Sequence, residues 1–120
     1  MKPFKTLLIS GCIATFAFAG QAMAHAHLSA SVPAAEATVD SPKLIEMTFT
    51  EPLELKLSTA MVMSSAGAHI ATAAPVLGGD GMTLIVPLTG PLAAGTYGVM
   101  WQVLSVDGHK TSGNYSFSVK

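Results

Sequence analysis

The chain has 120 residues, half of them hydrophobic, and its six lysines, seven acidic residues and lack of arginine give a net charge of −1. This length suits one domain with a single modest core. A weakly acidic chain without arginine matches a phosphate backbone poorly, so we expect no nucleic-acid partner.

Residues 1–24 have the pattern of a secretory signal. Two lysines precede a largely apolar stretch, residues 6–20, and Ala22-Met23-Ala24 matches a signal-peptidase site. The apolar stretch is shorter than the roughly 20 residues that a membrane-spanning helix needs. We therefore expect a cleaved leader, a periplasmic location and a mature domain of residues 25–120.

The only cysteine of the chain lies inside this leader. Ile9-Ser10-Gly11-Cys12 also resembles a lipoprotein box, in which Cys12 would become the lipidated first residue and His25 would stay inside the chain. If cleavage instead follows Ala24, the mature domain has no cysteine. It then forms no disulfide, and it cannot build a blue-copper site, which needs a thiolate.

The rest of the chain consists of short alternating or β-branched runs, separated by Pro, Gly and Asp clusters. Residues 44–50 alternate polar and apolar positions, as a strand with one buried face does. Seven such runs predict an all-β fold, an antiparallel Greek-key sandwich or barrel. The predicted strands are residues 27–31, 44–50, 60–64, 69–74, 82–87, 97–104 and 114–119.

One segment carries a more specific signal for a sandwich. Residues 91–97, Pro-Leu-Ala-Ala-Gly-Thr-Tyr, resemble the corner that precedes a late strand of such folds. Trp101 follows on the predicted strand, and we expect it to pack between the two sheets.

Histidines and one aspartate form the candidate metal site. Cleavage after Ala24 would make His25 the first residue, with an α-amine and an imidazole that can chelate one ion. Asp107-Gly108-His109 follows a predicted strand, and residues two apart in an extended segment project to the same side. Three nitrogens with a nearby carboxylate suit tetragonal Cu(II), whereas zinc would prefer a tetrahedral arrangement of the same groups.

Several short motifs in one order resemble the copper-resistance protein C (CopC) family of periplasmic copper carriers. The match covers nearly the whole predicted mature chain. The matching segments are residues 25–28, 31–34, 48–51, 91–97, 99–101, 105–109 and Gly113.

The resemblance implies a cupredoxin-like or immunoglobulin-like sandwich that binds one Cu(II) ion per chain through a histidine brace. Its ligands would be His25 with its amine, Asp107 and His109. Glu51 matches a family glutamate near the copper, either a weak axial ligand or a group that supports the ligands. The family also implies an inner-membrane partner of the CopD type, in copper homeostasis or resistance.

His27 allows a rival geometry. A free terminus with histidine at the third position can wrap Cu(II) in the amine, two deprotonated backbone amides and the imidazole. Strand hydrogen bonds would compete for those amides, so we favour the brace and expect a structural or supporting role for His27.

Some family members carry a separate Cu(I) site in a methionine-rich loop, and this chain departs from that pattern. Met61 and Met63 have strand spacing, and we expect them in the core. Residues 64–68 contain no thioether, and His69 is expected at the surface. We therefore expect no dedicated Cu(I) site.

Two other classes of function remain open. A histidine brace also occurs in copper-dependent polysaccharide monooxygenases, but those need more chain and a broad binding face, usually with aromatic platforms. The few aromatic residues here fall on strands that should be buried. We therefore expect a binding protein rather than an enzyme. An immunoglobulin-like adhesion module without metal is the other alternative.

Overall fold

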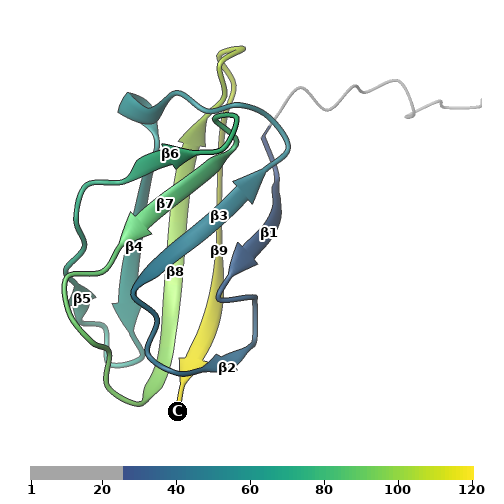
Figure 1. Ribbon diagram of the computed structural model, residues 1–120. Helices are drawn as coiled ribbons and strands as arrows, with labels where there is room; N and C mark the ends of the chain where they lie inside the picture. Colours follow the sequence, from purple (N-terminus) through teal and green to yellow (C-terminus); the bar gives the residue numbers. More distant parts are fainter. Residues whose placement is uncertain (1–25) are drawn as a thin grey trace, which may run out of the picture.

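The computed structural model describes residues 26–120, which form two β-sheets packed face to face (Figure 1). The first sheet has the order β1-β3-β7-β6 and the second the order β2-β9-β8-β4-β5. The first consists of β1 (Leu28–Val32), β3 (Leu44–Phe49), β7 (Thr83–Pro87) and β6 (Val76–Gly78). The second consists of β2 (Thr38–Val39), β9 (Lys110–Val119), β8 (Gly95–Leu104), β4 (Thr59–Ser64) and β5 (His69–Ile70).

The all-β sandwich is confirmed, and the strands differ from the prediction in detail. The described residues contain two short additional strands, β2 and β6, and β9 begins at Lys110 rather than at residue 114. All pairs are antiparallel except β2 with β9, which is parallel. A short 3-10 helix, Leu55–Leu57, connects β3 to β4. No helix within residues 26–120 is long and apolar enough to cross a membrane.

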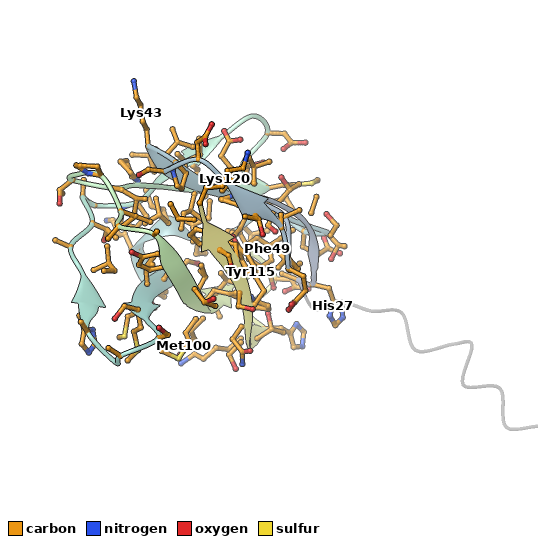
Figure 2. The ribbon with its side chains drawn as sticks, turned by 90° about the horizontal axis from the view of Figure 1, so that it is seen from below. His27, Lys43, Phe49, Met100, Tyr115 and Lys120 are labelled. Atoms are coloured by element: carbon orange, nitrogen blue, oxygen red, sulfur yellow. The ribbon has the colours of Figure 1, made fainter. Side chains whose placement is uncertain are left out.

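Strand alternation produces the core between the sheets. On β3, Ile45, Met47 and Phe49 are buried while the residues between them are more exposed. This is the period of two that places alternate side chains on one face of a sheet. Figure 2 shows Phe49 well inside the molecule, with Lys43 extending outward at its periphery.

Trp101 packs between the sheets, as predicted. Its ring lies edge-on to Phe49 of the opposite sheet, with ring centroids 5.0 Å apart and an interplanar angle of 74°. Gly113, the register partner of Trp101 on β9, leaves room for the indole, because a Cβ atom there would lie 2.5 Å from Trp101 Cζ2. The inward position of the Trp101 ring thus depends on the lack of a side chain at Gly113.

The segment before β8 forms a tyrosine corner. The Tyr97 hydroxyl donates a hydrogen bond of 2.6 Å to the carbonyl of Ala93, four residues earlier. This contact fixes the turn that leads into β8 and confirms the expectation drawn from residues 91–97.

Replacing Tyr97 with phenylalanine should lower the free energy of unfolding by about 1 kcal/mol, because it removes this hydrogen bond and keeps the ring. Urea titration would measure the change. Tyr115→Phe is the matched control, since the buried Tyr115 hydroxyl forms no hydrogen bond of good geometry within residues 26–120. Burial raises the pKa of Tyr115. The Ser31 hydroxyl, which is too poorly placed for a hydrogen bond of good geometry, lowers that pKa by a smaller amount. An equal loss in both variants would contradict the role of the corner.

The longest strands, β8 and β9, position the candidate site. They pair along their full length, from Gly95 with Val119 to Leu104 with Lys110. The turn that joins them lies at the same end of the sandwich as the start of β1, and the C-terminus lies at the other end (Figure 1). The paired strands therefore carry Asp107 and His109 to the end where the described chain begins.

Candidate metal centre

The β8–β9 turn is held by a compact set of hydrogen bonds. The amide of Ser105 donates to the carbonyl of His109, and the amide of Gly108 donates to the carbonyl of Ser105, both at 2.9 Å. Gly108 has φ +92°, a left-handed conformation that glycine adopts without the strain of a side chain. The glycine between Asp107 and His109 thus permits the tight turn expected from the sequence.

Asp107 and His109 are in contact within this turn. The distance between Asp107 Oδ1 and His109 Nδ1 is 3.1 Å, and the two side chains are 39% and 48% exposed, respectively. Both side chains are thus accessible and lie side by side at the turn. Because Nδ1 faces Asp107 in this arrangement and Nε2 faces away, the imidazole has to turn before both side chains can hold one ion.

Ser105 also holds the Asp107 carboxylate. The fully buried Ser105 donates its hydroxyl to Asp107 Oδ1, and the His109 amide donates to the same oxygen at 3.3 Å. The Ser105 hydrogen bond, with those of His109, outweighs desolvation and holds the pKa of Asp107 below its ordinary value of 3.8. The carboxylate is therefore anionic at neutral pH, and these contacts use Oδ1, which leaves Oδ2 to a metal.

The start of the described chain is fixed close to this turn. Ala26 is fully buried, and its carbonyl accepts a hydrogen bond of 2.7 Å from the hydroxyl of Thr111 on β9. The amide of His27 donates to Thr50 Oγ1, and the amide of Thr50 donates to the carbonyl of His27, both at 2.9 Å. The first described residues therefore lie between the end of β3 and the start of β9.

His25, the predicted leader and its cleavage site lie outside the described residues. Within residues 26–120, no three histidine, cysteine or carboxylate side chains are close enough to hold a metal ion. The described part brings together two of the three predicted ligands, Asp107 and His109. The third stays a prediction, although one peptide bond joins His25 to the fixed Ala26.

Glu51 lies in the segment between β3 and the 3-10 helix, at the same end of the molecule. Its neighbours on both sides are fixed: Thr50 pairs with His27, and the carbonyl of Pro52 accepts a hydrogen bond of 3.0 Å from the amide of Val106. Glu51 is half-buried. The segment that carries it thus adjoins both the chain start and the β8–β9 turn.

The other two histidines occupy different places. His27 is exposed just before β1, at the edge of the molecule in Figure 2. His69 is exposed on β5, an edge strand of the second sheet, and stands opposite Met63. His69 is therefore a surface histidine, as expected from the sequence.

The expectation that Met61 lies in the core is wrong. Met61 is 43% exposed and stands opposite Met100, which is 41% exposed, on the outer face of the second sheet. The buried residue of this segment is Val62, so the alternation of β4 turns Met61 and the half-buried Met63 outward. One reason for expecting no Cu(I) site is thereby removed, and the lack of thioethers in residues 64–68 remains.

Sequence analysis did not identify the threonines and the serine that hold the site together. Thr111, Thr50 and Ser105 are common β-sheet and turn residues, and their spacing carries no metal-binding pattern. The position of Thr111 two residues after His109, a spacing that places side chains of an extended segment on one side, is the one signal that could have singled it out.

Comparison with known proteins identifies the family of the chain. The family model described as the CopC domain matches residues 28–120. Protein YobA of Escherichia coli K12 is 46% identical over 99 residues, which cover 81% of this chain and 80% of YobA. Copper resistance protein C of Escherichia coli is 38% identical over 123 residues, covering 97% of this chain and 96% of that protein.

The solved structures point the same way. The crystal structure of PcoC, a methionine-rich copper resistance protein from Escherichia coli, superposes with a TM-score of 0.76 at 35% identity, covering 81% of this chain and all of that one. Sequence and fold together show that this chain belongs to the CopC family of copper resistance proteins.

Proposed function

We propose that the processed chain binds one Cu(II) ion in the periplasm through a histidine brace. The ligands are the α-amine and imidazole of His25, the imidazole of His109 and the carboxylate of Asp107. The observation that carries this proposal is the meeting of the chain start with the β8–β9 turn. Thr111, two residues after His109, is hydrogen-bonded to the residue that follows His25.

The chemistry of these groups favours cupric ion. Imidazole and amine nitrogens with a carboxylate suit tetragonal Cu(II), which also stands highest in the Irving–Williams order. The hydrogen bond from Ser105 lowers the pKa of Asp107 and fixes the carboxylate beside His109. Orientation of a ligand by such outer contacts strengthens metal binding.

His27 and Glu51 support this site in the proposal. The amide of His27 is engaged with Thr50, which favours the brace over a terminus wrapped around the ion. Glu51, on a segment fixed at both flanks, serves as a weak axial ligand or as a hydrogen-bonding partner of the ligands.

A binding role fits the surface better than catalysis. The aromatic residues within residues 26–120 are Phe49, Tyr97, Trp101, Tyr115 and Phe117, and all five are buried. An oxidase that acts on polysaccharides usually holds its substrate on exposed aromatic rings, and residues 26–120 expose none of theirs. We therefore assign the protein to copper homeostasis and resistance, sequestering copper or passing it to an inner-membrane partner of the CopD type.

Blocking the leading amine tests the proposal. Selective acetylation of the α-amine of the processed protein should lower Cu(II) affinity by about a hundredfold or more, beyond the loss typical of a supporting group. Competition titration against a chelator measures the change. A chain with one additional glycine before His25 is the second test, since it moves the amine away from the imidazole. Unchanged affinity in both proteins would refute the brace.

A further inference from the structure

Two threonines fix the first described residues from opposite sides. Thr111 on β9 donates its hydroxyl to the carbonyl of Ala26, and Thr50, which follows β3, accepts from the amide of His27. The amide of Thr50 also donates to the His27 carbonyl. The Ala26 side chain is fully buried. The two residues after His25 are thus attached to β9 of one sheet and to the residue that follows β3 of the other.

The Thr111 contact fixes Ala26 beside the start of β9. Consecutive Cα atoms are about 3.8 Å apart, and two residues of extended chain span at most about 7 Å. Thr111 is two residues from His109, and Ala26 is bonded directly to His25. Holding the Ala26 carbonyl on Thr111 therefore keeps Ala26, the residue that follows His25, close to the β8–β9 turn that carries His109.

The Thr50 contact opposes the rival geometry. A terminus wrapped around Cu(II) must deprotonate the amides of Ala26 and His27 and turn them toward the ion. The His27 amide instead donates to Thr50 Oγ1 at 2.9 Å, and the adjacent Thr50–His27 hydrogen bond would have to break as well. The wrapped form thus loses contacts that the brace retains.

We propose that Thr111 and Thr50 are positioning residues that select the histidine brace over the wrapped terminus. The proposal rests on the proposed function, because it concerns how the same site is assembled. Neither hydroxyl needs to contact copper. Each acts through the backbone of Ala26 or His27.

The single variant Thr111→Val removes the hydroxyl and keeps the shape of the side chain. It should lower Cu(II) affinity about threefold to tenfold, the equivalent of one hydrogen bond. Thr111→Ser should restore the wild-type value. Thr96→Val is the matched control: its hydroxyl contacts Ser118 at the far end of the β8–β9 pair, and its loss should leave affinity unchanged.

The double variant Thr50→Val/Thr111→Val tests the choice of geometry. Its electron paramagnetic resonance spectrum should change toward that of a four-nitrogen site. His109→Ala should lower the Cu(II) affinity of the double variant by a factor at least about ten times smaller than the factor by which it lowers that of the wild type. The reason is that the wrapped form does not use His109. Circular dichroism establishes whether each variant is folded. If the double variant does not fold, the single variants Thr111→Val and Thr111→Ser still test the role of Thr111.

Two results would overturn the inference. One is a Thr111→Val protein with wild-type affinity. The other is a folded double variant that keeps the wild-type spectrum and its full dependence on His109. Failure of the proposed function is a different outcome, in which the wild-type protein itself binds Cu(II) without need of His109 or a free amine.

Discussion

The variant His109→Ala should bind Cu(II) at least about a hundredfold more weakly than the wild type. The substitution removes one of the three nitrogens of the brace, and even the loss of a group that only orients a ligand costs about 10–100-fold in affinity. It also removes the partner that Asp107 contacts at 3.1 Å. The electron paramagnetic resonance spectrum should change at the same time, because the equatorial ligands change.

Two matched variants make this result decisive. His69→Ala removes an exposed histidine on β5, remote from the β8–β9 turn, and should leave affinity unchanged. His27→Ala separates the two geometries, since a wrapped terminus needs the His27 imidazole and the brace does not. A protein that keeps its Cu(II) affinity in the variant His109→Ala but loses it in His27→Ala would bind copper through the wrapped terminus alone.

Replacing Phe49 with alanine should have the largest effect on stability, lowering the free energy of unfolding by about 3–5 kcal/mol. Phe49 is 1% exposed and contacts Trp101 across the two sheets. A domain of this size has only about 5–15 kcal/mol of stability in total. The chain has no cysteine after residue 12, so no disulfide within the described part offsets the loss.

Urea titration followed by Trp101 fluorescence would measure this change. Val32→Ala is the control, because Val32 is 59% exposed on β1 and its truncation should alter stability by no more than about 0.5 kcal/mol. Similar losses in the two variants would contradict the assignment of Phe49 to the centre of the core. Copper affinity should also fall in Phe49→Ala, since the next residue, Thr50, holds His27.

Features that depend on local pattern could be predicted from the sequence. The alternation of residues 44–50 gave the position of β3, and Pro91 to Tyr97 indicated the corner that the Tyr97 hydroxyl forms. Both depend on side chains a few positions apart. The inward position of Trp101 followed from the same alternation on β8.

Features set by pairing between distant segments could not be predicted. β2 has two residues and β6 three, too few for a periodic signal, and each exists because a longer strand lies beside it. Met61 has the spacing of a core residue, but spacing alone does not say which face of a strand is inward. Only the pairing of β4 with β8 decides that.

The candidate site also has one part that could be predicted from the sequence and one part that could not. Asp107 and His109 are two residues apart, so their approach follows from the turn itself. The contacts of the chain start join residues 23 and 85 positions apart, which no local pattern reveals. The position of His25 relative to the turn remains a prediction, supported by the fixed place of Ala26.

The full-length pairing of β8 with β9 has a consequence for metal exchange. A turn at the end of a rigid ladder keeps its shape when its ion departs, because the strands beneath it are held by their own hydrogen bonds. The entropy lost in placing Asp107 and His109 side by side is therefore lost when the polypeptide folds, not when an ion is bound. In the proposed site, copper can thus bind and leave while the two strands beneath it stay unchanged.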